Sequence, residues 1–413
     1  MAQLSSPKSA SEIIPLQSFD TDVSPEESMI NRRKYIEDLV EQDLASVSDI
    51  SLEPGKLQKR NIENLIGSIQ LPLGIAGPIK ISGGNSNGSY FLPMATTEGT
   101  LVASTSRGAK AINMAGGASA HAKNNGMTRA PVFKLDSISD AEAFINWVHT
   151  NKILLQSESE KNSHYLKFKD ITCYQLGREV WLRLSFYTGD AMGMNMATKA
   201  AQQICDYIQQ HYPTARLVAL SGNLCTDKKQ AMINIINGRG ISVQAEVKIP
   251  AEIVTKVLKT DIASIVEVNK VKVWHGSAYA GSNLGYNAHF ANIVAAVFAA
   301  TGQDLAHVVD ASAGYCLMEE DNNNLYVSVT LPSVPAGDVG GGTSLPAQKT
   351  ARDLMLTDIS SKRTISTNRV LAFAEILACG VMAAEISLHA ALAQGTLASA
   401  HEKFGRGGRH ENK

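Results

Sequence analysis

The chain has 413 residues, and its 38 Lys and Arg residues against 39 Asp and Glu give a formal net charge of −1. A chain of this length accommodates about two to three domains. The balanced charge excludes general binding to a nucleic-acid backbone and polybasic attraction to a membrane. The five cysteines include no CxxC pair and the ten histidines show no paired ligand spacing, so we expect no disulfide framework and no metal site. These features favour a soluble, cytoplasmic protein.

Residues 1–62 are predicted to form a tail followed by a small helical region. Residues 1–23 have the composition of a mobile tail and contain no apolar run long enough for a signal peptide. Ser24-Pro25-Glu26-Glu27 supplies an N-cap, a proline at the first helical position and an acidic third residue, which together predict a capping box. We expect the Pro54-Gly55 pair to end this helical region.

Residues 63–129 are predicted to form the first part of a large domain. They are rich in Gly, Ala and Ser, which allow close backbone packing or close approach of a ligand. A helix is expected over Thr97–Met114, with Glu98 near its N-terminus. The helix dipole favours a carboxylate there, so Glu98 is either a partner of the helix end or an acid whose pKa is raised by burial or by a like charge.

Residues 130–220 are predicted to form an inserted domain of ferredoxin-like β-α-β-β-α-β order. The expected strands and helices are, in chain order, Ala130–Leu135, Asp140–Asn151, Tyr165–Cys173, Glu179–Tyr187, Met194–Gln210 and Arg216–Ser221. Between the last helix and the strand before it lies Gly189–Asn195, which is either a plain turn or a helix start whose N–H groups hold a pyrophosphate. The chain contains no GxGxxG turn and no P-loop, so a Rossmann site has no support.

Residues 221–413 are predicted to return to the large domain. Ser221–Lys229 is the densest polar cluster and follows an apolar strand, so it is a nucleophilic Ser/Lys pair, an oxyanion-stabilising lysine or a solvated turn. Asp304 lies at the unfavourable end of a helix and is expected to need a partner such as lysine. His401 precedes a glycine-rich tail and, taken alone, is an exposed histidine.

Further elements are expected in this last segment. The candidates are helices over Ala251–Leu258, Asn287–Thr301, Thr350–Met355 and Thr367–Ala393, and a strand over Asn324–Leu331. The long apolar run from Val370 to Ala393 contains Glu375, Glu385 and His389, which are costly in hydrocarbon. We therefore expect a buried helix rather than a membrane span.

A series of short motifs follow one another between residues 60 and 401. They are Glu63–Gly67, Pro72–Pro78, Pro93–Gly99, Gly126–Arg129, Gly189–Met196, Ser221–Asn223, Thr226–Lys229, Gly276–Ala278, Gly285–His289, Gly302–Asp304 and Val339–Thr343. In this order they resemble the 3-hydroxy-3-methylglutaryl-CoA (HMG-CoA) reductase family, and the Met-rich form of Asp190–Met196 is similar to the class shared by eukaryotes and archaea. The resemblance implies an α+β fold, with a large α/β domain around a central buried helix, an inserted ferredoxin-like dinucleotide-binding domain and a small N-terminal helical region.

The resemblance also implies a reaction and the residues that perform it. The family reduces HMG-CoA to mevalonate and CoA with two NADPH, through mevaldyl-CoA and mevaldehyde, in the mevalonate pathway of isoprenoid synthesis. By this likeness Lys228 matches the catalytic lysine, Glu98 the acid, Asp304 the aspartate between them and His401 the histidine that protonates departing CoA. A protonated lysine suits this chemistry because hydride attack creates an oxyanion.

The binding residues follow from the same resemblance. The hydroxymethylglutaryl group is expected on Arg129, Ser221, Asn223, Asp227, Lys229 and Lys272, and CoA on Arg107, Lys110, Lys259 and His289. The nicotinamide cofactor is expected on Asp190, Met192, Gly193, Met194 and Asn195, with Asn292 near the reacting centre. Ser163-His164 stands where relatives place a Ser-Arg pair near the 2′-phosphate, so NADH remains open beside NADPH.

Partners and alternatives complete the expectations. The family's active site forms between subunits, so we expect a homodimer or homotetramer whose other partners are HMG-CoA and CoA, with no nucleic acid and no membrane. The sequence shows no counterpart of the membrane anchor of the eukaryotic enzymes, so we expect either a naturally soluble enzyme, as in prokaryotes, or a shortened form of an anchored one. The alternatives are the same enzyme oxidising mevalonate with NAD, a Ser/Lys acyl-CoA hydrolase using Ser221 and Lys228, or a non-catalytic relative. The presence of all four catalytic residues argues against the last.

Overall fold

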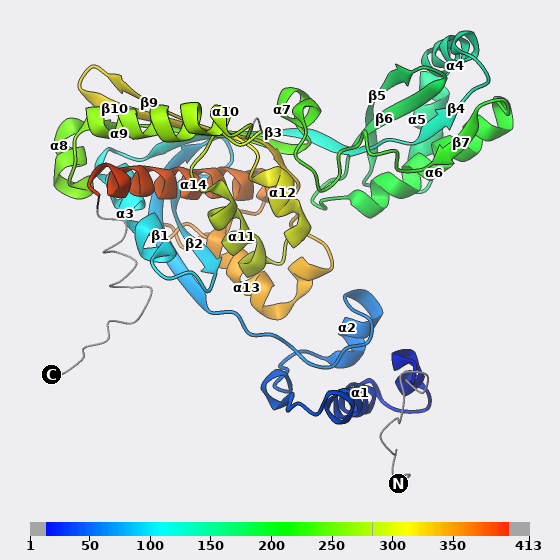
Figure 1. Cartoon of the computed structure of the whole chain (residues 1–413), viewed down its shortest axis with the longest axis horizontal. Coiled ribbons are helices and arrows are strands. Elements are labelled where there is room, and N and C mark those ends of the chain that lie inside the picture. The colour runs from blue at the N-terminus through cyan, green and yellow to red at the C-terminus, as the bar shows by residue number, and fades with distance from the viewer. Residues whose placement is uncertain (1–13, 283, 396–413) are drawn as a thin grey trace. The chain divides into compact units, whose positions relative to one another are not determined.

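The computed structural model describes residues 14–282 and 284–395 (Figure 1). The predicted roles of His401 and of the glycine-rich tail therefore lie outside the described residues. The described residues divide into two compact units, of which one comprises residues 14–72 and 344–346 and the other residues 73–282, 284–343 and 347–395.

The smaller unit is helical. Its elements are η2 (Leu16–Asp20), α1 (Pro25–Val40), η3 (Ala45–Val47) and α2 (Pro54–Arg60). The capping box of α1 is confirmed, because Ser24 accepts the N–H of Glu27 and the Glu27 carboxylate accepts the N–H of Ser24. The predicted end at Pro54 is wrong: this proline begins α2, where its missing N–H leaves no hydrogen bond unmade.

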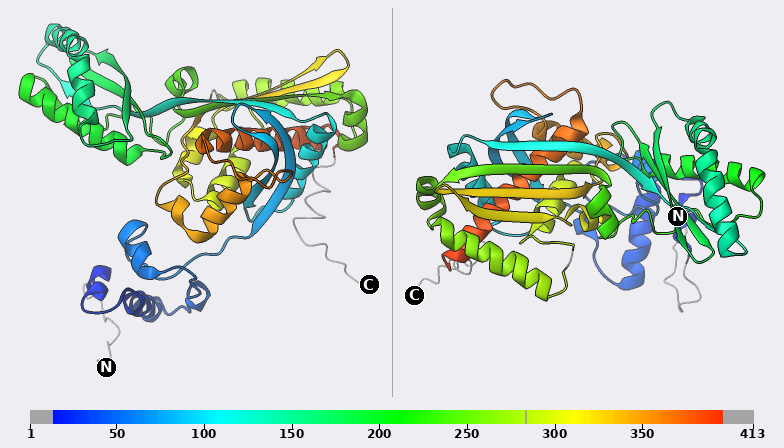
Figure 2. Two further views of the ribbon diagram at one scale, coloured as in Figure 1. Left: turned by 180° about the vertical axis from the view of Figure 1, so that it is seen from behind. Right: turned by 90° about the horizontal axis from the view of Figure 1, so that it is seen from above.

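The main sheet of the larger unit has the strand order β2-β1-β3-β8-β10-β9. The strands are β1 (Leu73–Gly83), β2 (Asn87–Ala95), β3 (Ala118–Arg129), β8 (Gly240–Pro250), β9 (Tyr315–Asp321) and β10 (Asn324–Val334). Only β1 and β3 pair in parallel. Along β8 the side chains alternate between buried and more exposed positions, so one face of the sheet is turned to the core. Figure 2 shows the long strands of this sheet running side by side.

The core against this sheet is built on α14 (Arg369–Ala393), which confirms the predicted buried helix. Among the described residues it is the one helix long and apolar enough to cross a membrane, yet 89% of its most apolar window is buried. Its two buried carboxylates have polar partners. Glu375 accepts N–H groups of Asn85 and Ser86, and Glu385 accepts those of Ala288 and His289. The helix therefore fixes two loops as well as the core.

The predicted inserted segment has a hydrophobic core of its own. The strands are β4 (Val132–Lys134), β5 (Lys167–Leu176), β6 (Glu179–Tyr187) and β7 (Arg216–Ala219), and the helices are α4 (Ile138–Thr150), α5 (Lys152–Glu160) and α6 (Met194–His211). The antiparallel strand order β7-β4-β6-β5 is that of a ferredoxin-like plait, as predicted, whereas α5 is an addition. Strand β3 joins both sheets, because its first part pairs with β8 and its last three residues pair with β6.

The remaining elements connect these layers. They are α3 (Leu101–Met114), α7 (Met232–Asn237), α8 (Ala251–Ile253), η4 (Val254–Leu258), α9 (Ile262–Val268), η5 (Asn269–Gly276), α10 (Ser277–Tyr279), α11 (Phe290–Thr301), η6 (Leu305–His307), α12 (Val308–Ala311), η7 (Gly342–Ser344) and α13 (Pro346–Met355). Helix α3 begins four residues later than predicted, because Thr100 adopts a left-handed conformation. Glu98 consequently lies in the loop before the helix.

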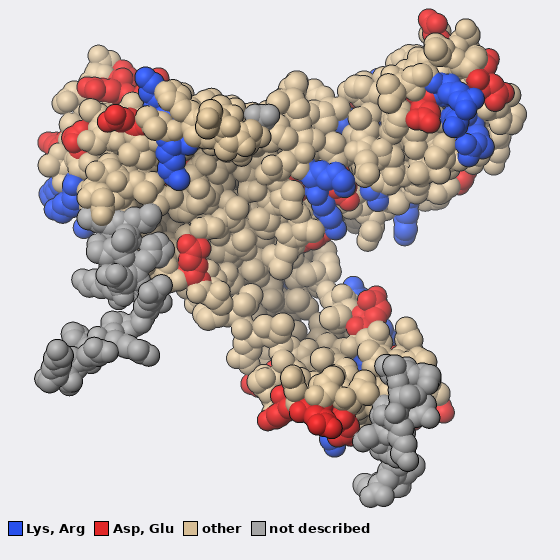
Figure 3. All heavy atoms as spheres, in the orientation of Figure 1, with Lys and Arg blue, Asp and Glu red and all other residues tan. Residues whose placement is uncertain are grey.

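The described surface carries charges of both signs. On the face shown in Figure 3, Lys and Arg side chains and Asp and Glu side chains occur in small separate groups. This distribution agrees with the net charge of −1 and forms no broad field of one sign on that face.

Candidate active site

Lys228 lies in the loop between β7 and α7, and this loop is backbone-strained. Asn223, Thr226 and Lys228 have φ values of 63°, 54° and 58°, which side-chain-bearing residues rarely adopt. Two hydrogen bonds from neighbouring strands fix the loop in this conformation. The indole N–H of Trp181 donates to the carbonyl of Gly222 at 2.8 Å, and the Thr128 hydroxyl donates to the carbonyl of Cys225 at 2.9 Å. Strain maintained in this way is typical of functional loops.

Lys228 pairs with Asp304. The Lys228 Nζ atom lies 3.0 Å from Oδ2 of Asp304, and the two side chains are 44% and 36% exposed. Asp304 also caps η6 by accepting the N–H of Ala306 at 3.0 Å. Partial burial by itself raises the pKa of Asp304, but the Lys228 hydrogen bond, the Ala306 N–H and the nearby His307 outweigh it and hold that pKa below its usual value. The lysine partner expected for Asp304 is thus present, and the pair is charged.

Behind this pair lies a set of ionisable side chains, which we call the Arg239 network: Arg239, Asp227, His307 and Asp310. Arg239 donates to Asp227 and to Asp310 at 2.9 Å each. His307 Nδ1 lies 3.1 Å from Asp310. Because Arg239, His307 and Asp310 are at most 1% exposed, these contacts form away from bulk water.

Arg129 and Ser221 form a polar face beside the Lys228 loop. Arg129 donates to the hydroxyls of Ser221 at 3.2 Å and Thr198 at 3.0 Å, and its NH1 atom is 3.9 Å from Asp227. Cys225 Sγ lies 3.5 Å from the Ser221 hydroxyl. Burial raises the pKa of Cys225, but hydrogen bonds from Ser221, the Asp227 backbone and Arg129 bring it below its usual value. A guanidinium and a hydroxyl side by side suit a carboxylate ligand.

The predicted residues Asn223 and Lys229 belong to the same loop. Lys229 is exposed, and its Nζ donates to the backbone carbonyl of Asp227 at 3.1 Å. The exposed Asn223 accepts the N–H of Thr226 through its backbone carbonyl at 2.9 Å.

Glu98 is brought to Asn292. The Asn292 side-chain amide donates to Oε1 of Glu98 at 3.3 Å, from the first turn of α11. The other end of α11 runs through Gly302 into Asp304, so one helix positions both Asn292 and Asp304. No hydrogen bond or ion pair joins Glu98 to Lys228 within the described ranges.

The predicted cofactor loop packs against two other motifs. Ala191 forms a β-bridge with Val339, and the backbone carbonyl of Asp190 accepts the N–H of Asp338 at 2.7 Å. Gly302 and Gly342 approach so closely that a Cβ atom on either would overlap the backbone of the other. The turn that carries Asp304 therefore packs against the Val339–Thr343 motif, which also contacts the cofactor loop.

Met194 links the cofactor loop to the charged centre. Its Sδ atom accepts a hydrogen bond from Arg239 NH2 at 3.1 Å, and Arg239 also contacts Asp227 next to Lys228. Met194 begins α6, whose N-terminus follows directly on Met192 and Gly193. Asn195, the second residue of that helix, is exposed. The N-terminal end of α6 thus lies beside the Lys228 loop.

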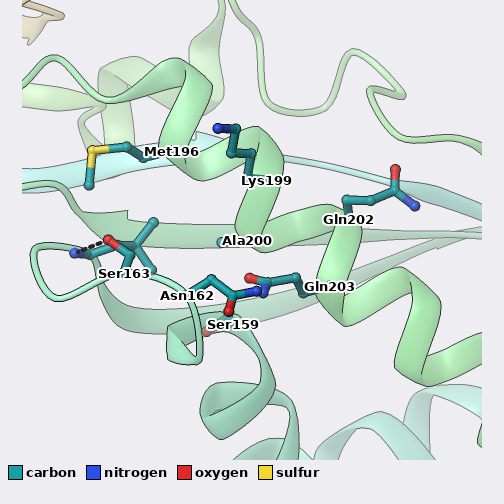
Figure 4. Close-up of a pocket in the computed structure, with 9 residues that line it drawn as sticks. Ser159, Asn162, Ser163, Met196, Lys199, Ala200, Gln202 and Gln203 are labelled. Carbon is teal, nitrogen blue, oxygen red and sulfur yellow. Dashed lines mark hydrogen bonds between the residues drawn. The ribbon is translucent and has the colours of Figure 1, made fainter.

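A cavity of about 410 Å³ lies between α5, the segment that follows it and α6. Figure 4 shows Met196, Lys199 and Gln203 on α6, with the Gln203 side chain beside Asn162 and the Lys199 side chain pointing away from Asn162. Lys199 is the single cation of the lining, no carboxylate lines the cavity, and Lys199 has no ion pair within the described part of the chain. One unneutralised cation among uncharged lining side chains suits a phosphate-bearing ligand. Ser163 lines this cavity, and the exposed His164 follows it directly.

Among the described residues, neither the predicted CoA contacts nor Lys272 forms a hydrogen bond or ion pair with Lys228. Arg107 instead donates to Ser387 on α14, and burial lowers its pKa. His289 Nε2 is 4.0 Å from the buried Glu385. Lys110, Lys259 and Lys272 are exposed and form no ion pair with any described residue.

Sequence reasoning missed Arg239, His307 and Asp310. His307 and Asp310 have one signal in the sequence: Asp304, His307 and Asp310 are spaced at three-residue intervals, which places them on one side of a helical turn. That spacing does not reveal Arg239, which enters from the residue before β8. Among the described residues, no group of three or more His, Cys, Asp or Glu is placed to hold a metal ion.

Comparison with known proteins identifies the family. A family model described as hydroxymethylglutaryl-coenzyme A reductase matches residues 28–406. The chain belongs to the HMG-CoA reductase family. A 3-hydroxy-3-methylglutaryl-coenzyme A reductase of Aeropyrum pernix is 48% identical over 383 residues, which cover 92% of this chain and 90% of that protein. The enzyme of Methanothermobacter thermautotrophicus is 43% identical over 395 residues, covering 95% and 97% of the two chains.

The fold is also that of a solved member of the family. A class II HMG-CoA reductase from Streptococcus pneumoniae, determined with bound NADPH in open conformations, superposes with a TM-score of 0.66. The two chains are 16% identical, and the match covers 92% of this chain and all of that one. The similarity at this identity establishes the fold, while family membership makes this chain an oxidoreductase that reduces HMG-CoA in the mevalonate pathway.

Proposed function

We propose that this chain reduces HMG-CoA to mevalonate and CoA with two NADPH at the site formed by Lys228 and Asp304. The observation that carries the proposal is the Lys228 Nζ atom held 3.0 Å from Asp304 on a strained loop. A fixed ammonium beside a polar face that suits a carboxylate matches an acidic thioester substrate.

The chemistry asks two things of these residues. NADPH, when bound, supplies a hydride twice, first to the thioester carbon and then to the aldehyde carbon. Each addition leaves negative charge on the attached oxygen, which Lys228 stabilises as a hydrogen-bond donor. Asp304 keeps Lys228 charged, and Glu98, oriented by Asn292, donates the proton that the oxygen requires. His401 protonates the CoA thiolate that departs when the C–S bond breaks.

The carboxylate of the hydroxymethylglutaryl group is proposed to bind Arg129 and Ser221, which already contact each other. Asp227, which directly precedes Lys228, orients Arg129. Asn223, Lys229 and Lys272 complete the proposed set, and CoA is proposed to contact Arg107, Lys110, Lys259 and His289. For CoA to reach Arg107, the guanidinium must exchange its bond to Ser387 for one to the ligand.

The cofactor is proposed to lie along α6. Its diphosphate meets the N-terminal end of α6 through Asp190, Met192, Gly193, Met194 and Asn195. The cavity beside Ser163 then receives the adenosine 2′-phosphate. Relatives place an arginine near this phosphate where this chain has His164, and Lys199 takes the role of that arginine. Lys199→Gln should lower kcat/KM with NADPH about tenfold and leave NADH unaffected, because only NADPH carries this phosphate. An equal loss with both cofactors would contradict this subsite, and Lys248→Gln on the main sheet is the matched control.

The assembly and location are further parts of the proposal. We propose a homodimer or a larger homo-oligomer that is soluble in the cytoplasm and works in the reductive direction. Glu98 and Lys272 are both exposed in the single chain, which leaves them accessible to a second subunit. The acyl-hydrolase alternative has no support in the geometry, because the Ser221 hydroxyl contacts Arg129 and Cys225 while Lys228 contacts Asp304.

Replacement of Lys228 tests the site. Lys228→Ala should lower the rate of NADPH oxidation with HMG-CoA by about 10²–10³, as for loss of one oxyanion donor, and leave the fold intact. Lys248→Gln, which removes an exposed lysine of the main sheet, should retain the full rate. Lys228→Ala with more than about a tenth of the normal rate would remove Lys228 from the proposed role.

A further inference from the structure

His307 is a buried, titratable residue that the proposed reaction does not use. It ends η6 and is 0% exposed. Three carboxylates surround its ring. Nδ1 lies 3.1 Å and 3.2 Å from the two oxygens of Asp310, and Nε2 lies 3.6 Å from Asp227 and 3.8 Å from Asp304. Such an environment acts on the charge of the imidazole.

The contacts of the two ring nitrogens indicate the protonation state. An ionised carboxylate only accepts hydrogen bonds, so Nδ1 carries a proton toward Asp310. Nε2 is buried and has no hydrogen-bond partner among the described residues, yet it faces two carboxylate oxygens within 4 Å. A bare lone pair there would be repelled by both oxygens, whereas an N–H would be attracted to both.

The neighbouring arginines are paired with other groups, so His307 is the side chain that faces Asp304 from the protein interior. Arg239 neutralises Asp310 and Asp227, to which it donates directly. Arg129 approaches Asp227 at 3.9 Å but is turned toward Ser221. Asp304 has Lys228 on its exposed side, and on its buried side the one basic side chain within ion-pair distance among the described residues is His307.

We propose that His307 is held as an imidazolium that shares the Oδ2 atom of Asp304 with Lys228, and so acts as a positioning residue for Lys228. The inference rests on the proposed function. With a second cation on the same oxygen, Asp304 stays ionised and its attraction for the Lys228 ammonium is divided. The ionised Asp304 still holds Lys228 as an ammonium, and the divided attraction leaves Lys228 a hydrogen bond to offer to the substrate oxygen.

The effect on Asp304 agrees with this arrangement. Partial burial raises the pKa of Asp304, while the Lys228 hydrogen bond and the Ala306 N–H lower it, and the charge of His307 lowers it further. Loss of the imidazolium should therefore move the pKa of Asp304 upward. The acidic limb of the kcat profile, below which Asp304 is protonated and releases Lys228, should move to higher pH.

Two substitutions separate charge from shape. His307→Gln keeps a neutral donor near the position of Nε2, and His307→Asn keeps one near Nδ1. Both should lower kcat by about ten- to a hundredfold with little change in KM for HMG-CoA, and both should shift the acidic limb upward. His149→Gln, at an exposed position on α4, should change neither quantity. An acidic limb that stays in place in folded variants, checked by thermal unfolding, would overturn the proposal.

The charge of His307 can also be measured without turnover. In protein labelled with ¹⁵N in the histidine rings, the His307 resonances, assigned by their loss in His307→Gln or His307→Asn, should show both nitrogens protonated at neutral pH. A neutral ring with a bare Nε2 would overturn the inference. A wild-type chain that shows the imidazolium signal but does not reduce HMG-CoA would instead reject the proposed function alone.

Discussion

Asn292 holds Glu98 at the N-terminal end of α11, because its side-chain amide donates to the Glu98 carboxyl at 3.3 Å across 194 positions of sequence. This contact orients an exposed carboxyl that the sequence predicts only as part of the first turn of a helix. An orienting donor leaves the second oxygen of Glu98 available to the substrate, which is what a general acid requires.

Replacement of Glu98 should therefore affect chemistry rather than folding. Glu98→Gln should lower kcat by about 10²–10⁴, the usual contribution of a positioned acid, because glutamine cannot donate a carboxyl proton. Steady-state rates of NADPH oxidation with HMG-CoA measure the loss. Glu142→Gln, at an exposed position on α4, should keep the wild-type kcat. A Glu98→Gln enzyme within about threefold of wild type would contradict the acid role.

A shared site between subunits makes a separate prediction. Inactive Glu98→Gln and Lys228→Ala proteins, mixed and allowed to exchange subunits, should regain part of the wild-type activity. Recovery is expected because a mixed dimer with the site built from both chains contains one site with both native residues. Each variant mixed with itself is the control. Mixtures that exchange subunits, as seen by native mass spectrometry, but remain inactive would place both residues in one chain's own site.

The crossing of α3 and α14 predicts a large loss of stability from one methyl group. A Cβ atom at Gly108 would overlap the backbone carbonyl of Ala383, which a buried helix cannot move. Gly108→Ala should lower the free energy of unfolding by about 3 kcal/mol, measured by denaturant titration. Gly285→Ala, where the nearest atom to a new Cβ is 3.7 Å away, should change it little. Equal stability of the two variants would contradict this packing.

Asp358 provides a prediction for pH and stability. Its carboxylate accepts the N–H groups of Ser89 and Ser361 at 2.9 Å each, and hydrogen bonds from Ser361 and Ser89 lower its pKa to about 2. A lowered folded-state pKa means that the stabilisation is complete above the unfolded-state value near ~4 and is lost as the pH falls toward the folded-state value.

Replacement of this carboxylate tests that reasoning. The difference in free energy of unfolding between wild type and Asp358→Asn should be largest at neutral pH and should shrink as the pH falls below ~4. Denaturant titrations from neutral pH downward measure it. Asp321→Asn is a useful comparison, because this substitution removes an ion pair with Lys248 rather than hydrogen bonds from the backbone. A difference for Asp358→Asn that does not depend on pH would contradict the assignment.

Much of the local structure could be predicted because the signals are local. The bounds of β6 agree with the prediction at both ends, α6 differs by one residue, and the capping box at Ser24 is present. Strands β1, β2 and β3 were missed because their Gly, Ala and Ser residues hide the alternation that identifies a strand. Pro54 was misjudged because proline both ends and begins helices.

The candidate site divides in the same way. The lysine partner of Asp304 could be expected from its position at a helix end, and the motifs indicate Lys228. The contact between Glu98 and Asn292 depends on how α11 packs against β2, which no local pattern reports. Arg239 and His307 were missed for the same reason, since burial among aspartates is a property of the fold.

Reduction of HMG-CoA by this chain is tested most directly by the stoichiometry of the reaction. Purified protein is given HMG-CoA and NADPH, and cofactor oxidation and free thiol are followed in one sample. The account predicts two NADPH oxidised for each CoA thiol released. Thiol release without cofactor oxidation would contradict it and indicate hydrolysis of the thioester.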